Sequence, residues 1–208
     1  MSRFGFPSRE WPTHFDAASN AEAAVHTDQR AASPSPMGPA LETPRLSLRE
    51  MSMADLDFVA EMLADPEVMR FYPKPYTRDE SVTWIERQLG RYSRDGHGLW
   101  LVASRETGAP VGQVGLAMQE VDGVREPEIG YLVHRPFWRR GFASEAAKAV
   151  RDHAFGALGM PRVISLIRPV NAPSAGVARK IGMTPGRLTT FAGLEHRVFA
   201  ALRAIPLG

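Results

Sequence analysis

The fold is decided by residues 131–146, which read YLVHRPFWRRGFASEA and describe a strand, a basic loop and the start of a helix. The first backbone N–H groups of a helix have no partner inside it, and the helix dipole adds about half a positive charge there. Gly141 and Ala143 let a ligand approach that backbone closely, and Arg139 and Arg140 add two full charges. The stretch predicts a phosphate-binding turn; an ordinary loop with a surface arginine pair is the alternative.

The same stretch limits the kind of phosphate ligand. It lacks the Gly-Lys-Ser/Thr ending of a nucleotide-hydrolysing P-loop and the three glycines of a dinucleotide fold. We therefore expect a ligand that carries a pyrophosphate and needs no magnesium. His97, His153 and His196 show no metal-ligand spacing, so no metal is expected.

Composition narrows the class of protein. The chain has 208 residues, enough for one domain with a sizeable core, and no cysteine, which excludes disulfides and any enzyme that holds its substrate on a cysteine. The net charge is only +2 and the arginines are dispersed, so a nucleic-acid partner is not indicated. We see no secretory signal and no apolar run of about 18 residues for a membrane span, and therefore expect a cytoplasmic protein.

The first forty residues differ from the rest. Residues 1–40 hold no Leu or Ile but eight Ala, five Pro and five Ser. Such a segment buries too little apolar surface to offset the entropy of ordering it. We expect a mostly disordered extension over residues 1–40 and one domain over residues 41–208.

The domain predicts helices and strands in an α+β order. Two helices begin at capping boxes, Ser52 with Asp55 and Thr77 with Glu80, and Asp95-Gly96 ends the second. Two further helices are expected over 142–158 and 173–181. Alternating or apolar runs predict strands at 45–49, 99–104, 111–118, 128–133, 163–167, 187–191 and 197–202. We expect one mixed, mostly antiparallel sheet flanked by helices.

Four motifs in order along the chain resemble the GNAT superfamily of acyl-CoA-dependent N-acetyltransferases. Glu128–Tyr131 with Trp138–Ala143 resembles its motif A, and Asn171, Ser174, Lys180, Gly182 and Met183 resemble its second cofactor motif. Residues 111–116, VGQVGL, resemble its central strand. Residues 65–70, DPEVMR, resemble the first helical region of the branch that includes the ribosomal-protein N-terminal acetyltransferases. The resemblance covers about residues 41–202.

The resemblance implies where a cofactor binds. The strand ending near Val133 would splay from the strand ending near Ile167, with the pantetheine arm of acetyl-CoA in the gap. Backbone groups of Leu132 and Val133 would bind that arm. The pyrophosphate would be held by the N–H groups of Arg140, Gly141, Phe142, Ala143 and Ser144, with the guanidinium groups of Arg139 and Arg140 nearby. Asn171 would contact the pantetheine or acetyl end and Lys180 the outer phosphate; a surface position on the helix is the alternative for Lys180.

Acetyl transfer to an amine needs a neutral amine, stabilisation of a developing oxyanion, and a proton for the departing thiolate. Without cysteine, direct attack in a ternary complex is the simpler scheme. Glu128 shares a strand face with Leu132 and is our candidate base; a surface glutamate is the alternative. Many relatives place a tyrosine at Ala178 to protonate the thiolate, and Ser174, one turn earlier, is our candidate acid, with a helix cap as its other role.

The aromatic residues Phe71, Tyr72 and Trp84 fall where the family's acceptor groove forms, although core packing explains Trp84 equally well. We therefore predict an acetyl-CoA-dependent N-acetyltransferase, a monomer or homodimer, that acts on a primary amine. The amine would belong to a protein N-terminus, a polyamine or an aminoglycoside-like small molecule, and coenzyme A would be the second product. The alternative is a non-catalytic acyl-CoA-binding regulatory module.

Overall fold

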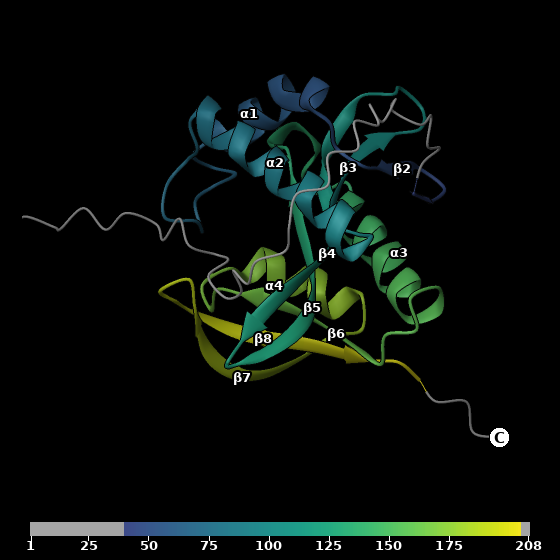
Figure 1. Ribbon diagram of the computed structural model, residues 1–208, viewed down its shortest axis with the longest axis vertical. Coiled ribbons are helices and arrows are strands. Elements are labelled where there is room, and N and C mark those ends of the chain that lie inside the picture. Colours follow the sequence, from purple (N-terminus) through teal and green to yellow (C-terminus); the bar gives the residue numbers. More distant parts are fainter. Residues whose placement is uncertain (1–39, 205–208) are drawn as a thin grey trace, which may run out of the picture. The chain divides into compact units, whose positions relative to one another are not determined.

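A sheet of eight strands organises residues 40–204, the part of the chain that the computed structural model describes (Figure 1). The strands are β1 (Leu41–Glu42), β2 (Leu46–Arg49), β3 (Leu99–Ser104), β4 (Pro110–Val121), β5 (Val124–Val133), β6 (Arg162–Ile167), β7 (Thr184–Phe191) and β8 (Leu194–Leu202). The helices are α1 (Leu56–Ala64), α2 (Arg78–Asp95), α3 (Phe142–Gly156) and α4 (Ala172–Lys180), with short 3-10 turns η1 (Met53–Asp55) and η2 (Arg135–Phe137). The sheet order is β1-β2-β3-β4-β5-β6-β8-β7.

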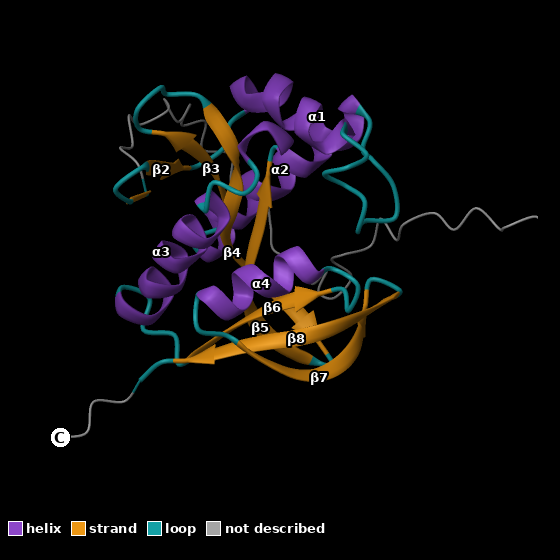
Figure 2. Ribbon diagram, turned by 180° about the vertical axis from the view of Figure 1, so that it is seen from behind, coloured by secondary structure: helices purple, strands orange, loops and turns teal. Residues whose placement is uncertain are grey.

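The centre of the sheet is its least regular point. Each neighbouring pair is antiparallel except β5 and β6, which are parallel and share a single registered pair, Glu128 with Ile164. β5 pairs with β4 along its whole length instead. Figure 2 shows β2, β3 and β4 on one side of this point and β6, β8 and β7 on the other. The expected mixed, mostly antiparallel sheet that splays between Val133 and Ile167 is confirmed.

Local signals set the helix boundaries. The Thr77 hydroxyl accepts from the Glu80 N–H at 3.2 Å and the Glu80 carboxylate accepts from the Thr77 N–H at 2.8 Å, so α2 begins at the predicted capping box. It ends at Gly96, whose φ of 73° suits glycine. The box of Ser52 and Asp55 opens η1, which leads directly into α1.

The two faces of the sheet carry different helices. Ile129 of β5 belongs to a buried cluster built on α3 and α4, whereas Leu132 packs against a cluster built on α1 and α2. The alternation predicted for this strand is therefore present, and it places Glu128 and Tyr131 on opposite faces. The backbones are close here, because a Cβ on Gly115 of β4 would overlap the backbone of Gly98.

Several predicted boundaries were wrong. β4 and β5 form a hairpin that reaches Val121 and Val124, beyond the predicted strands at 111–118 and 128–133. β7 and β8 each begin three residues before the predicted start. In these cases ladder hydrogen bonds continue through residues that carry no apolar alternation.

Residues 1–39 lie outside the described residues, and with them nearly all of the predicted extension. No helix found in residues 40–204 combines the length and the apolar character needed to cross a bilayer.

Candidate active site

The predicted phosphate-binding turn opens α3. Gly141 is its N-cap with a φ of 81°, and Arg139 also has a positive φ, 63°. The first helical hydrogen bond runs from the Glu145 N–H to the Gly141 carbonyl at 3.0 Å. The N–H groups of residues 142–144 therefore precede the helical ladder and are available to an anion. Gly141, Arg139 and Arg140 are exposed, and Phe142, Ala143 and Ser144 are half-buried.

The basic loop is anchored to the end of β5. The Trp138 indole donates to the Val133 carbonyl at 2.6 Å, and the Phe137 and Phe142 rings lie 6.3 Å apart. The Arg140 guanidinium stacks on Phe137 at 5.5 Å. These contacts hold the loop in one position beside the strand, so the turn is preorganised.

A second support, which the sequence did not reveal, comes from a segment 100 residues earlier in the chain. The Arg45 guanidinium donates to the Glu145 carboxylate at 2.6 Å and to the Arg140 carbonyl at 3.1 Å, and the Thr43 hydroxyl donates to Glu145 at 2.6 Å. Burial acts to raise the pKa of Glu145, but the hydrogen bonds from Thr43 and Arg45 hold it below its usual value. We call these contacts the Arg45 brace; they join β2 to the turn and the first helical turn of α3.

Where β5 and β6 part, side chains form hydrogen bonds with backbone groups of both strands. The Ser165 hydroxyl donates to the Ile129 carbonyl at 2.7 Å, and the Leu166 N–H donates to the Glu128 carboxylate at 3.2 Å. Neither bond is a ladder bond, so the ladder pairing of β5 and β6 stops after Glu128 and Ile164, and the gap begins there.

The backbone that faces this gap differs in part from the prediction. His134 N–H bonds to Val111 on β4, and an antiparallel ladder alternates, so Leu132 also turns its backbone to β4. Tyr131 and Val133 turn theirs to the gap. The prediction that Leu132 offers its backbone to the gap is therefore wrong, because Tyr131 does so instead. Val133 faces the gap as predicted, and its carbonyl already accepts from Trp138.

The candidate base, Glu128, lies at the start of the gap. The Gln119 amide donates to its carboxylate at 2.8 Å, on the oxygen that Leu166 leaves free. Burial raises the pKa of Glu128, against these two hydrogen bonds, which act to lower it. A carboxylate with a raised pKa is a stronger base than an exposed one.

The candidate acid, Ser174, has a partner that the sequence did not reveal. Its hydroxyl donates to the Tyr131 hydroxyl at 3.1 Å, and Tyr131 donates to the Ser174 carbonyl at 2.8 Å. Asn171 caps α4, because its side-chain oxygen accepts from the Ser174 N–H at 3.1 Å, so the capping role weighed for Ser174 is wrong. Ala178 is fully buried, so no side chain reaches the gap from it. Burial raises the pKa of Tyr131 to about 12.

An aromatic pocket lies on the other face of the sheet. Its side chains close on a shallow hollow that has no room for a water molecule. Its walls are Leu63, Met69, Tyr72, Tyr76, Trp84, Gln113 and Leu132. The Trp84 indole donates to the Gln113 side chain at 2.9 Å, which fixes the ring. Tyr72 and Trp84 are thus brought together as predicted, but Phe71 does not line the pocket and instead stacks under Arg70 at 4.6 Å.

Lys180 is exposed in the last turn of α4, which leaves both of its predicted roles open. Within residues 40–204, no group of three or more His, Cys, Asp or Glu side chains is placed to hold a metal ion. The arrangement combines an anion-binding turn, a gap between strands, a carboxylate and an aromatic pocket. Such a site can hold an extended phosphorylated ligand against an acceptor.

Comparisons with known proteins agree with this geometry. Residues 45–184 match the family model described as acetyltransferase (GNAT) domain. The uncharacterized protein YkkB of Bacillus subtilis is 37% identical over 148 residues, which are 69% of this chain and 84% of that protein. The crystal structure of an acetyltransferase from Agrobacterium tumefaciens has a TM-score of 0.70 at 30% identity and matches over 88% of this chain and 99% of its own. RimL, a ribosomal L7/L12 alpha-N-protein acetyltransferase solved in complex with coenzyme A, shares the fold with a TM-score of 0.64 at 16% identity, over 77% of this chain and 95% of its own.

Proposed function

Because the chain belongs to the GNAT acetyltransferase family, we propose that it transfers the acetyl group of acetyl-CoA to a primary amine and releases coenzyme A. The observation that carries the proposal is the parting of β5 and β6 after the single pair of Glu128 and Ile164, beside a helix N-terminus whose first amides are free. RimL, which shares this fold, holds coenzyme A.

The residues of the turn suit the phosphates of acetyl-CoA. The N–H groups of residues 142–144 form a set of donors that suits a pyrophosphate. The turn that presents them needs the positive φ of Gly141. Arg139 and Arg140 supply charge beside it. The N–H groups of Tyr131 and Val133 would bind the pantetheine amides along the gap, and Asn171 would lie at its acetyl end. The bound group supplies a thioester, which activates the acetyl carbon.

The remaining chemistry falls to two side chains on opposite faces of the sheet, Glu128 on β5 and Ser174 on α4. Glu128 takes the proton of the amine, directly or through a water, so that a neutral nitrogen attacks. The new N–C bond forms as the C–S bond breaks. The Ser174 hydroxyl gives its proton to the departing sulfur and regains the proton that the nitrogen loses as it becomes an amide. A backbone N–H near Val133 stabilises the charge that develops on the carbonyl oxygen.

The acceptor amine would enter over the aromatic pocket that holds Tyr72 and Trp84. A protein N-terminus, a polyamine and an aminoglycoside-like molecule each present a primary amine. The fold neighbour RimL acts on the N-terminus of a ribosomal protein, which supports a peptide as one of these acceptors.

Calorimetry with acetyl-CoA tests the proposal. Gly141→Glu puts a side chain and a negative charge into the anion site, so binding should be lost while the fold is kept. Gly108→Glu is the matched control, because Gly108 also has a positive φ, 72°, but lies in the turn before β4. Binding to the wild type and the control alone would support the site, and equal binding to Gly141→Glu would overturn it. Turnover with a panel of amines then separates an enzyme from a regulatory module that binds acetyl-CoA without consuming it.

A further inference from the structure

Arg168 carries a buried guanidinium nitrogen without a hydrogen-bond partner among the described residues. Its Nε is buried and unpaired, and one Nη lies 3.4 Å from the Phe71 carbonyl, at the long end of the hydrogen-bond range. Burying an unpaired charged donor costs free energy, so such groups in native proteins normally have an acceptor. A guanidinium in this state is prepared for an anion.

The position of Arg168 relates it to the candidate base. It follows β6 directly, two residues after Leu166, whose N–H donates to Glu128 at 3.2 Å. Leu166 packs with Ile164 and Val198 on the face away from α3 and α4, the face that Glu128 also occupies. Two strand residues span about 6–7 Å, so Arg168 lies one step beyond the base along the gap.

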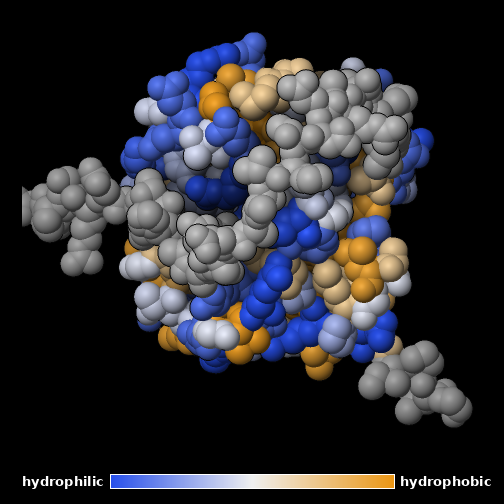
Figure 3. All heavy atoms as spheres, in the orientation of Figure 1, coloured by the Kyte–Doolittle hydropathy of each residue, from blue (hydrophilic) through white to orange (hydrophobic). Residues whose placement is uncertain are grey.

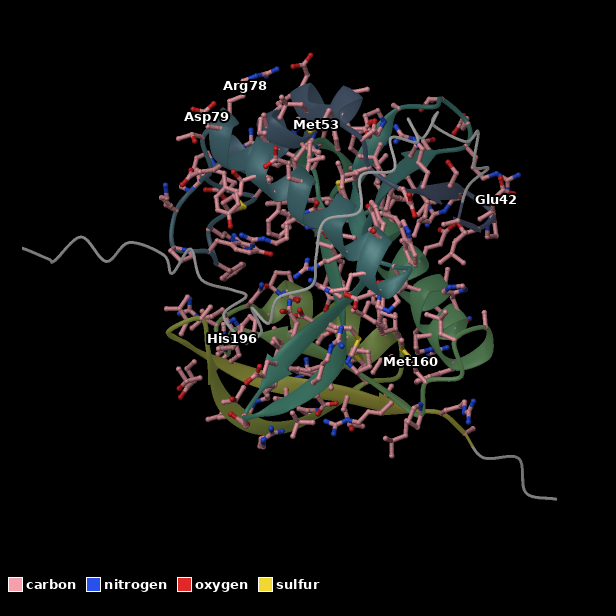
Figure 4. The ribbon with its side chains drawn as sticks, viewed as in Figure 1. Glu42, Met53, Arg78, Asp79, Met160 and His196 are labelled. Atoms are coloured by element: carbon pink, nitrogen blue, oxygen red, sulfur yellow. The ribbon has the colours of Figure 1, made fainter. Side chains whose placement is uncertain are left out.

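The neighbour of Arg168 across the sheet supplies no negative charge. β6 pairs with β8 through Ile167 and Arg197, so the next position sets Arg168 against His196, which Figure 4 labels. Burial lowers the pKa of His196, and the charge of Arg168 lowers it further. His196 is therefore a neutral neighbour near pH 7.

Helix α2 adds two more cations near the aromatic pocket over which the acceptor amine would enter. Arg87 stacks on Trp84 at 5.8 Å, and Arg91, one turn on, is half-buried with only a 3.2 Å bond to the Gln88 side chain. Burial lowers the pKa of Arg91, and Glu128 opposes that effect through its charge. Among the described residues Arg87, Arg91 and Arg168 form no ion pair, and Arg91 is the cation whose charge acts on Glu128. Figure 3 shows hydrophilic surface along the β4–β5 hairpin on this side of the molecule.

We propose that the acceptor amine also carries an oxyanion, a carboxylate or phosphate group, which Arg168 binds while the amine lies at Glu128. This inference rests on the proposed acetyl transfer. Nε and one Nη of a guanidinium form a fork that matches two oxygens of such a group. The acceptor is thus amino-acid-like, with the amine and the oxyanion a few bonds apart. Polyamines and aminoglycosides, which carry further positive charges, are disfavoured by the three arginines.

Matched pairs of acceptors test the inference on the full chain. L-phenylalanine is compared with its amide and 4-aminobutyrate with butylamine, while O-phosphoethanolamine against ethanolamine distinguishes phosphate from carboxylate. Each pair is assayed at equal concentrations of unprotonated amine. In at least one pair the oxyanion member should show a kcat/KM higher by about tenfold or more, because one charge-assisted hydrogen bond is worth at least that factor.

Variants then test whether Arg168 is the residue that binds the oxyanion. Arg168→Gln should abolish the preference, by a tenfold rise of KM for the oxyanion member alone. Arg162→Gln is the matched control. Arg162 is the first residue of β6, the strand that Arg168 follows, and it also has a buried Nε without a partner, but it pairs with Glu126 at 3.1 Å. Arg168→Lys, which keeps the charge without the fork, gives an intermediate preference and serves if the Gln variant unfolds.

Failure of the inference differs from failure of the proposed function. Three results would overturn the inference that the acceptor carries an oxyanion. They are equal acetylation of neutral amines, a preference that survives in Arg168→Gln, and acetyl-CoA binding with no turnover of any pair. Absence of acetyl-CoA binding to the wild type in the calorimeter would overturn the function itself.

Discussion

At the scale of single residues, Glu128 joins the structure of the gap to its chemistry. Its carboxylate accepts from Leu166, whose N–H would bond to a strand carbonyl in a continuous sheet. It also accepts from Gln119 at 2.8 Å, so both oxygens are oriented. Parting of the strands therefore creates the place for a half-buried carboxylate, and these two hydrogen bonds hold it there.

The pH dependence of the reaction should report this burial. Because burial raises the pKa of Glu128, the carboxylate form that takes a proton is reached only at a pH above that of an ordinary glutamate. Activity should thus rise with pH through the raised pKa. Glu128→Gln should lower kcat/KM on the order of 10²-fold and remove this acid limb, with acetyl-CoA affinity kept. A pH–rate profile of both proteins with one acceptor checks this; an unchanged acid limb in the variant would exclude Glu128 as the base.

Ser174 is the second residue whose role can be isolated. Asn171 caps α4, so Ser174→Ala removes a hydroxyl without removing the cap. We expect kcat to fall on the order of 10²-fold while the dissociation constant of acetyl-CoA changes much less. Stopped-time assays and calorimetry measure the two quantities.

Tyr131→Phe serves as the companion variant. It leaves the Ser174 hydroxyl without its acceptor at 3.1 Å and should also lower kcat, since the pair orients the proton. Turnover of Ser174→Ala equal to that of the wild type would leave the serine with a structural role only.

At the scale of elements, the Arg45 brace connects β2 to the turn before α3. One guanidinium reaches a carbonyl of the turn and a carboxylate of the helix, and it stacks on Phe142 at 4.8 Å. Arg45 is itself half exposed, with 51% of its side chain accessible, so its charge is screened and its value lies in geometry.

Arg45→Ala should therefore weaken acetyl-CoA binding more than it weakens the fold. We expect a dissociation constant raised by about tenfold, because the amides of residues 142–144 lose their fixed position. Arg49→Ala is the matched control, since Arg49 ends β2, the strand that Arg45 precedes, and pairs with Asp55, away from the turn. Calorimetry and thermal unfolding of both variants check the expectation. Equal losses of affinity in the two would show that the brace does not position the turn.

Much of the fold followed from local signals. Thr77, Glu80 and Gly96 bound α2 because capping is decided within a few residues. The turn at Gly141 was also predicted from its own stretch. Contacts between distant segments were not: Arg45 meets Glu145 and Tyr131 meets Ser174 only in the folded chain. Leu132 was misassigned for a related reason, since the ladder that decides which way its backbone points involves β4.

At the scale of the whole molecule, the described residues 40–204 contain a continuous set of buried apolar side chains. The buried apolar side chains within residues 40–204 run from Leu46 to Ala201, and the family match begins at residue 45. The composition of residues 1–40 still predicts a mostly disordered extension.

A chain that begins at Gly38 should accordingly keep both stability and cofactor affinity. We expect the same midpoint of thermal unfolding and the same dissociation constant for acetyl-CoA as in the full chain, because a segment of this composition is expected to bury little apolar surface. Differential scanning calorimetry and titration of both chains check this. A lower midpoint or a weaker affinity would show that the extension packs on the domain.

The single registered pair of β5 and β6 has one more consequence, for amide hydrogen exchange. A sheet joined at one residue pair is a seam between two half-sheets, and the N–H groups beyond it have no ladder to protect them. In the free protein the amides of Tyr131 and Val133 should exchange with solvent faster than those of neighbouring β3 and β4. A pantetheine chain laid into the seam would act as the missing strand, so acetyl-CoA should slow exchange at those positions and leave β7 and β8 unchanged.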